Sequence, residues 1–307
     1  MNWISMSKKA AMAFAFGVCA AFATGNALAT ESGGGMYPNG AEGVMAGALP
    51  PPGLYYLNYL THYAADRLND GDGKRIPVDF HVNASANVSR FVYMTGYHLL
   101  GGNLGFYANI PLVHLSGTLV PTPGVNLSRT KSGLGDISFS PFLLAWHGKN
   151  WHTATAIEIN APTGQYNKDA AFNIGRNYWS FQPVVAGTVL TDNGFELSVK
   201  AMLDFNTENN DSNYQSGHEF HFDYATAYHW GSWTFGAQGY FYKQISNDEQ
   251  NGVKVAPDGN QGQIFAVGPT IKYDYKNMSV ELKYQKELLV QNRPEGDKYW
   301  LKLIWAF

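Results

Sequence analysis

The sequence predicts an all-β fold, an antiparallel transmembrane β-barrel of about twelve strands, with ten or fourteen strands as alternatives. The first observation is the strict alternation of the last ten residues, 298–307, which is typical of a strand with different surroundings on its two faces. The second is that charged residues make up only 15%, whereas a soluble domain carries about 25%. The third is that no apolar run beyond residue 29 is long enough for a transmembrane helix, although aromatic residues reach 15%.

The N-terminus predicts export. A short basic stretch precedes an apolar run over residues 10–23, and an A-x-A cleavage site ends at Ala29. We interpret residues 1–29 as a cleavable signal peptide, cut after Ala29. Cys19, the only cysteine, lies inside it. The mature chain therefore has no thiol for a disulfide, for nucleophilic catalysis or for metal binding.

Residues 30–52 are rich in glycine, proline and alanine and show no strand pattern. We interpret them as an irregular periplasmic leader, either disordered or folded back into the barrel lumen. Their composition favours disorder. The transmembrane barrel is expected over residues 53–307.

From Leu54 onward, patterned segments of roughly ten residues alternate with turn signals, which is the signature of a transmembrane barrel. The predicted strands are 54–64, 77–95, 103–118, 134–146, 151–161, 178–191, 195–206, 217–230, 233–245, 262–275, 279–290 and 298–307. Short turns facing the periplasm alternate with long outer loops, such as 119–133 and 291–297. Because the strand count is even, both termini would lie in the periplasm.

Each strand is expected to turn an apolar face to lipid and a polar face to the lumen. In segment 195–206 one face is apolar throughout, and the other carries Glu196, Lys200 and Asp204. A slip of one residue would place these charges in hydrocarbon, at a cost of about 2–4 kcal/mol for a midplane Lys or Arg. In the second segment the pattern changes face near residues 87–90, which predicts a bulge.

The inward faces collect charged side chains and a group of tyrosines and glutamines. These charges would line a selective passage, or form a static network of ion pairs that fills the lumen. The aromatic members would suit a small apolar or aromatic ligand. The lumen-lining candidates are Glu158, Tyr178, Gln182, Glu196, Lys200, Asp204, Glu219, His221, Asp223, Tyr240, Tyr242, Lys272, Glu281, Lys283 and Glu287.

An enzymatic alternative depends on His114 and Ser116, which share an expected lipid-facing side. A His-x-Ser pair at the rim of a barrel resembles outer-membrane phospholipase A. That family follows the serine with Asn-Gly, whereas Gly117 follows directly here, and we find no asparagine placed to orient the histidine. We therefore predict no catalytic residues.

The sequence gives no clear metal or cofactor site. Glu219, His221 and Asp223 share a face but lack a fourth ligand. The Asp70–Gly73 stretch resembles a fragment of a calcium loop, and an ordinary tight turn is favoured. No phosphate loop or dinucleotide motif is present, and the net charge of −3 does not suggest a nucleic-acid partner. We predict no metal and no cofactor.

Several short motifs of the sequence match a known family. They include Gly133–Asp136, Pro162–Tyr166, Asn173–Pro183, Ser216–Asp223 and Asn292-Arg293. In these motifs the chain resembles the meta-pathway phenol degradation proteins, also called SphA-like transporters. The resemblance implies an outer-membrane barrel that admits hydrophobic or aromatic compounds. It brings no established binding residues.

Together these observations predict a channel of the bacterial outer membrane for passive uptake of small hydrophobic or aromatic solutes, linked to phenol degradation. The gate would be an outer loop or the leader. The expected partners are the solute, outer-membrane lipid and the barrel assembly machinery, which would recognise the C-terminal strand ending in Phe307. Two alternatives are a lipid-modifying barrel enzyme and a plugged structural barrel.

Overall fold

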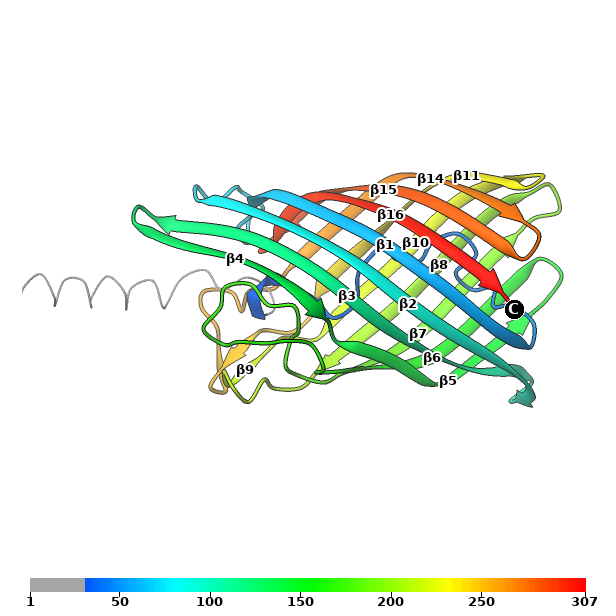
Figure 1. Ribbon diagram of the computed structural model, residues 1–307, viewed down its shortest axis with the longest axis horizontal. Helices are drawn as coiled ribbons and strands as arrows, with labels where there is room; N and C mark the ends of the chain where they lie inside the picture. Colours follow the sequence, from blue (N-terminus) through cyan, green and yellow to red (C-terminus); the bar gives the residue numbers. More distant parts are fainter. Residues whose placement is uncertain (1–30) are drawn as a thin grey trace, which may run out of the picture.

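The computed structural model describes residues 31–307, so the predicted signal peptide lies outside the described residues. These residues form a closed antiparallel barrel of twelve strands, elongated along its axis (Figure 1). Neighbouring strands in sequence are neighbours in the wall, and β1 closes the barrel by pairing with β16. The wall strands are β1 (Gly53–Leu68), β2 (Asp79–Leu99), β3 (Gly102–Thr122), β5 (Ile137–His147), β6 (Trp151–Ala161), β7 (Ser180–Leu190), β8 (Phe195–Asn206), β10 (Glu219–Trp230), β11 (Trp233–Gln244), β14 (Gln263–Tyr275), β15 (Met278–Gln291) and β16 (Pro294–Ala306).

Four of the remaining elements are short and lie outside the main wall. A 3-10 turn, η1 (Glu31–Gly33), opens the described chain. Three two-residue strands, β9 (Tyr214–Gln215), β12 (Glu249–Gln250) and β13 (Val253–Lys254), form a separate sheet among the loops. No helix within residues 31–307 is long and apolar enough to cross a membrane.

Strand β4 (Val125–Leu134) corrects one predicted boundary. Residues 119–133 were expected to form a long loop, but β3 continues to Thr122 and turns tightly into β4. β4 and β5 both pair with β3, one after the other, so they act as a single long strand interrupted at residues 135–136. The sequence of β4 is mostly polar, yet the strand pairs with β3 over most of its length, so its polarity does not indicate a loop.

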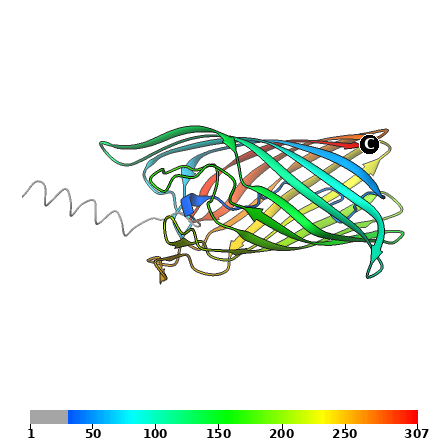
Figure 2. The same ribbon diagram turned by 60° about the horizontal axis from the view of Figure 1, so that its bottom comes forward.

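The two ends of the barrel differ, as Figures 1 and 2 show. At the turn end, neighbouring strands are joined by short turns, and the C-terminus lies here. The loop end carries longer connections, including residues 162–179 and 245–262. Two connections at the loop end are short, contrary to prediction: β3 turns into β4, and β15 turns into β16 at Asn292–Arg293, where residues 291–297 were expected to form a loop.

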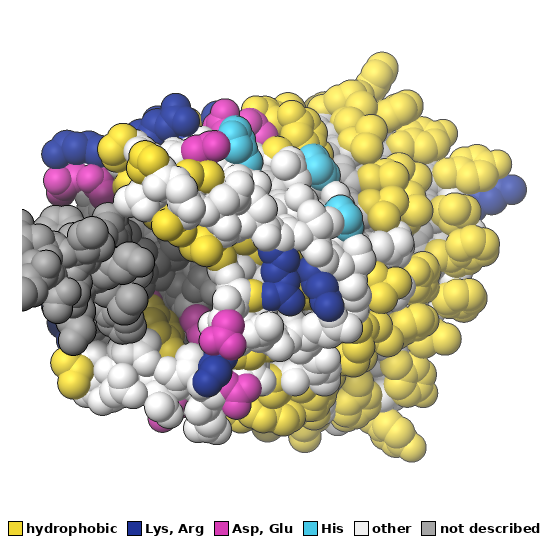
Figure 3. Space-filling model, turned by 60° about the vertical axis from the view of Figure 1, so that its left-hand side comes forward, with side chains coloured by type: hydrophobic (Ala, Val, Ile, Leu, Met, Phe, Trp, Pro, Cys, Tyr) yellow, Lys and Arg dark blue, Asp and Glu magenta, His cyan; other side chains and the backbone are white. Residues whose placement is uncertain are grey.

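The wall alternates between an exposed apolar face and a buried polar face. On β8, Leu197 is 52% exposed, whereas its neighbours Glu196 and Ser198 are fully buried in the interior. The exposed hydrophobic side chains gather in a belt toward the turn end, and polar side chains cover the loop end (Figure 3). Such a belt is the lipid-facing surface of a transmembrane barrel.

Strand β2 keeps its alternation through residues 87–90, so the predicted bulge there is wrong. Its register with β1 is continuous, and the irregularity occurs later, between Met94 and His98 in the pairing with β3. The pattern appeared to change face because Asn87 points outward. Its Oδ1 accepts a 2.6 Å hydrogen bond from the Asn58 side chain on β1, so the two amides satisfy each other on the outer surface.

Residues 31–52, here called the inserted segment, run through the barrel interior from the loop end to the turn end (Figures 1 and 2). Glu31 lies at the loop end, where it accepts hydrogen bonds from Tyr166 and Asn209. β1 then begins at Gly53 beside the C-terminus, because Phe307 donates its backbone N–H to Leu54. The expectation of both termini at one end therefore holds for the barrel strands but not for Glu31.

Candidate functional site

The inner wall of the barrel has two chemically different halves. The polar half, formed by β8, β10, β11, β14, β15 and β16, carries most of the buried carboxylates, lysines and glutamines. The apolar half, formed by β1, β2, β3, β5, β6 and β7, carries small and aliphatic side chains. Its buried members near the turn end are Val92, Met94, Leu143, Ala145, Ala154, Ala156, Val184 and Ala186.

The inserted segment is bound mainly to the polar half. Asp223 on β10 is the centre of this contact, because its carboxylate accepts three hydrogen bonds from the segment. The donors are the Tyr37 hydroxyl at 2.7 Å, the Gly40 amide at 2.7 Å and the Glu42 amide at 3.0 Å. Backbone amides within a barrel need partners, and Asp223 provides them for a stretch without regular structure.

Further contacts extend along the segment. The Lys283 ammonium on β15 donates to the carbonyl oxygens of Gly40 at 2.9 Å and Ala41 at 2.5 Å. Toward the turn end, the Met45 amide donates to Glu196 at 2.6 Å. At Gly47 the backbones meet so closely that an added Cβ would lie 2.7 Å from the carbonyl carbon of Gly187, so a larger residue would not fit.

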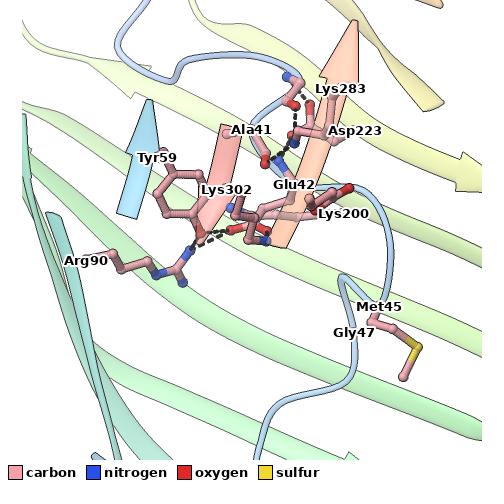
Figure 4. Close-up of polar contacts among 12 residues, drawn as sticks. Ala41, Glu42, Met45, Gly47, Tyr59, Arg90, Lys200, Asp223, Lys283 and Lys302 are labelled. Atoms are coloured by element: carbon pink, nitrogen blue, oxygen red, sulfur yellow. Dashed lines mark hydrogen bonds and ion pairs between the residues drawn. The ribbon is translucent and has the colours of Figure 1, made fainter. Parts of the chain in front are cut away.

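Glu42 connects the inserted segment to the first and last strands (Figure 4). Its Oε1 accepts hydrogen bonds from Arg90 on β2 and from the Tyr59 hydroxyl on β1, both at 2.7 Å. Its Oε2 accepts one from Lys302 on β16 at 2.6 Å. All four side chains are largely buried, with the Glu42 side chain 12% and the Lys302 side chain 6% exposed. We call these four side chains, Glu42, Tyr59, Arg90 and Lys302, the closure. A buried carboxylate held by two cations is stable only while both cations remain.

Three cavities lie in a row beside the inserted segment, lined mainly by the apolar half and in part by residues of the polar half. The outer cavity, at the loop end, has a volume of about 280 Å³ and is lined by Phe80, Val82 and Phe172 among others. The middle cavity measures about 180 Å³ and the inner cavity, at the turn end, about 400 Å³. The outer and middle cavities share seven lining residues, including Thr61 and Trp300, and are therefore adjacent.

The middle and inner cavities meet at a polar junction. Three residues line both of them: Glu42, Arg90 and Lys200. The closure made by Glu42 and Arg90 thus lies across the row of cavities, while the surfaces on either side are largely apolar. The row of cavities is thus interrupted at one polar constriction.

The loop between β6 and β7, residues 162–179, folds into the loop end of the barrel. Asp136, at the interruption between β4 and β5, accepts hydrogen bonds from the backbone amides of Gly164 at 2.8 Å and Arg176 at 2.7 Å. Gly164 and Gly175 pack so closely that a Cβ on either would contact the backbone of the other. The motifs around Asp136, Gly164 and Gly175, which are separated in the sequence, therefore come into contact here. Partial burial and the hydrogen bond to Glu31 raise the pKa of Tyr166 to about 12.

The structure turns all the sequence-predicted lumen residues toward the interior and divides them into two groups. Six line the cavities: Glu158, Lys200, Tyr240, Lys272, Glu281 and Glu287. The others are buried in the interior and do not line these cavities: Tyr178, Gln182, Glu196, Asp204, Glu219, His221, Asp223, Tyr242 and Lys283. His221 illustrates the second group, since its Nε2 lies 3.0 Å from Asp204 and its ring stacks on Tyr37.

Sequence reasoning missed Glu42, Arg90 and Tyr59 of the closure, whereas alternation already turns Lys302 inward. Glu42 carries the only charge between Glu31 and Asp66, and this isolation in an apolar stretch was the available signal. Arg90 was hidden by the bulge expected around it. Tyr59 gave no signal, because tyrosines are frequent on both faces of the wall.

His114 and Ser116, the residues considered for catalysis, each pair with a different neighbour. The His114 ring lies on the outer surface with Nδ1 2.6 Å from Ser132 Oγ, and Ser116 pairs with Thr130 at 3.1 Å. Each side chain thus contacts β4. Within residues 31–307 no group of three or more histidine, cysteine or acidic side chains could hold a metal ion.

Comparison with known proteins relates this barrel to a protein family and to solved structures. Residues 65–303 match the model of a family described as the putative MetA-pathway of phenol degradation. The barrel is similar to the COG4313 outer membrane channel from Pseudomonas putida F1, with a TM-score of 0.76 and 16% identity over 87% of this chain and 99% of that one. At this identity the likeness shows the fold. No curated protein matches the chain.

Two further barrels are more distant. The transport unit of the autotransporter AIDA-I from Escherichia coli has a TM-score of 0.49 and 12% identity, covering 86% of this chain and 95% of that one. The CymD monoaromatic hydrocarbon channel has a TM-score of 0.46 and 10% identity, covering 92% of this chain and 98% of that one. These scores are too low to bear on function.

Proposed function

Since the chain belongs to the family of the putative MetA-pathway of phenol degradation, we propose that it is an outer-membrane channel for the passive uptake of small hydrophobic or aromatic compounds. The loop end would face outward and the turn end the periplasm. Residues 1–29 would direct export, and the C-terminal strand ending in Phe307 would be recognised by the barrel assembly machinery. The belt of exposed hydrophobic residues would contact outer-membrane lipid.

The observation that carries the proposal is the row of three cavities along the apolar half. A cavity of about 150 Å³ lined by aliphatic and aromatic groups is large enough to bind benzene. The middle cavity, at about 180 Å³, is therefore suited to a single aromatic ring. A sugar would have to leave water for a lining that combines aliphatic side chains with polar groups already bonded to one another, such as Ser138 and Glu158, which is unfavourable.

The inserted segment would act as a fixed partition, and its link through Glu42 would act as the gate. Most of its hydrogen bonds reach the polar half, whereas Glu42 reaches across to Arg90 and Tyr59. Separating Glu42 from Arg90 would join the middle and inner cavities without undocking the segment from Asp223. The solute's own gradient would drive uptake, maintained by its consumption inside the cell.

The central test is uptake into liposomes that contain the folded mature protein. We expect phenol-like probes to enter faster than into empty liposomes, which must be subtracted because such probes cross bilayers unaided, and we expect sugars to stay outside. Equal uptake of sugars and aromatic probes would contradict the selective passage. Absence of any protein-dependent uptake would favour the plugged structural barrel, which the filled polar half makes the strongest alternative.

A disulfide separates a fixed partition from a segment that must leave. An added Cβ at Gly43 would lie 3.6 Å from the Cβ of Gln238 on β11, which suits a disulfide, since bonded pairs are roughly 3.5–4.5 Å apart. In the oxidised Gly43→Cys/Gln238→Cys variant we expect aromatic uptake to continue at the rate of the reduced variant. A fall to background on oxidation, restored by a reductant, would show instead that the segment undocks during transport. Each single-cysteine variant is the control for oxidation itself.

A further inference from the structure

We propose that the passage prefers aromatic amphiphiles with one anionic head group, and that Lys200 and Arg90 bind this oxyanion at the junction of the middle and inner cavities. The inference rests on the proposed function and names the solute class within it. A carboxylate is the expected head group, because a simple phenol, with a pKa of about 10 as for tyrosine, is neutral at pH 7.

Of the three side chains that line both cavities, two are cations and one is a carboxylate. Glu42 is the one carboxylate that lines both cavities, beside Arg90 and Lys200. Its two oxygens already accept hydrogen bonds from Arg90, Tyr59 and Lys302. Lys200 forms no ion pair within residues 31–307. Its ammonium lies 3.4 Å from the Tyr37 hydroxyl and 4.5 Å from the centre of the Tyr37 ring.

Two other carboxylates face this layer, and the groups that donate hydrogen bonds to them are neutral. Glu158 on β6 accepts hydrogen bonds from Tyr107 at 2.5 Å and Ser138 at 2.8 Å. Asp223 accepts the three donors of the inserted segment. Both carboxylates keep their negative charge near Lys200, but neither forms an ion pair with its ammonium, and Lys200 is only 6% exposed. Burying a charge without a partner is unfavourable, so an anion arriving beside it would be stabilised.

Arg90 provides a second donor. Its Nη1 is used by Glu42, while its buried Nε has no hydrogen-bond partner within the described residues. The guanidinium is held over the Tyr107 ring, 4.2 Å from the ring centre, which fixes its direction. A carboxylate at the junction would then accept hydrogen bonds from Arg90 Nε and from the Lys200 ammonium, and charge-assisted bonds of this type are the strong ones.

The apolar surfaces on both sides of the junction accommodate the rest of such a molecule. The ring would lie in the middle cavity against Val88 and Val113 before crossing, and in the inner cavity against Leu57 and Val92 afterwards. The head group would stay close to the two cations during the transfer. A cationic amphiphile of the same size would meet like charge at the constriction.

Equilibrium binding tests the inference separately from transport. Isothermal titration of the folded mature protein in detergent would compare 3-phenylpropionate with uncharged 3-phenylpropanol and with the phenyltrimethylammonium cation. We expect the carboxylate to bind roughly tenfold more tightly than the alcohol, the effect of a hydrogen bond to a charged group. Lys200→Met should abolish this preference, and Lys200→Arg should retain it. Lys286→Met, which removes a lysine paired with Asp297 outside the lumen, is the charge-matched control.

The results of these measurements distinguish the anion site at Lys200 from the proposed channel function. Equal affinities for the carboxylate and the alcohol, or a preference that survives Lys200→Met, would overturn the anion site while leaving uptake of neutral aromatics intact. Tight, Lys200-dependent binding of the carboxylate without uptake of any probe would support the site and contradict the channel. If Lys200→Met fails to fold, Lys200→Gln is measured in its place against the same two ligands.

Discussion

Removal of the inserted segment is expected to convert the barrel into an unselective pore. A variant that lacks residues 31–50 should admit sugars into liposomes and conduct ions freely, because the polar half would then face a water-filled lumen. The carboxylates and lysines that now bind the segment would be hydrated instead of stranded, so the barrel itself should remain folded. Single-channel conductance and sugar-driven liposome swelling measure the change.

The same deletion has an outcome that would contradict this view. If the variant folds and still excludes sugars, the loops at the loop end must close the lumen, and the inserted segment would not be the principal barrier. Asp223→Asn is the milder companion, since it weakens three hydrogen bonds of the segment without shortening the chain. The pore of this variant should open intermittently, whereas the pore of the deletion variant should stay open.

Loss of the Glu42 carboxylate is expected to have the second large effect. Glu42→Ala would leave Arg90 and Lys302 buried without their shared partner, and breaking a buried pair in this way costs about 3–5 kcal/mol. Part of this cost would appear as lower stability of the docked segment, measured by denaturant unfolding in detergent. We also expect faster aromatic uptake, because the constriction between the middle and inner cavities would be weakened.

The matched control for this substitution is Glu31→Ala, at the loop end of the same segment. Glu31 also accepts two hydrogen bonds, from Tyr166 and Asn209, but it does not line the junction. We expect this variant to leave aromatic uptake unchanged. The double variant Glu42→Ala/Arg90→Met should be less destabilised than the sum of its parts, because the two residues share one interaction. Additive effects would argue against a gate formed by Glu42 and Arg90.

The barrel could be predicted from the sequence because its signal is local and repeated. Strict alternation, as in β8 and β16, follows from the two different surroundings of the wall, and the closed barrel needs no further information. The predictions failed where polarity was taken for a loop or a bulge. β4 is polar because it lies beyond the apolar belt, and Asn87 faces outward because Asn58 satisfies its amide.

The site could be predicted only in part. Alternation alone turns Lys200 and Glu158 inward, but it does not show that the two halves of the wall differ in what covers them. That division depends on the inserted segment, whose residues have no periodic pattern. The closure by Glu42 joins residues up to 260 positions apart. A contact of this kind leaves no local trace except the isolated charge itself.

The course of the inserted segment also has a consequence for how the chain folds. Its partners Asp223, Lys283 and Lys302 all belong to the second half of the sequence. The segment therefore cannot dock fully until the strands that carry these residues have formed. β1 and β16 then close the barrel around the inserted segment. Docking is therefore expected after the folding transition state has formed, and contacts made so late govern the rate of unfolding. The small side chains of the segment let it be enclosed late, and its removal should accelerate unfolding while leaving the rate of barrel formation unchanged.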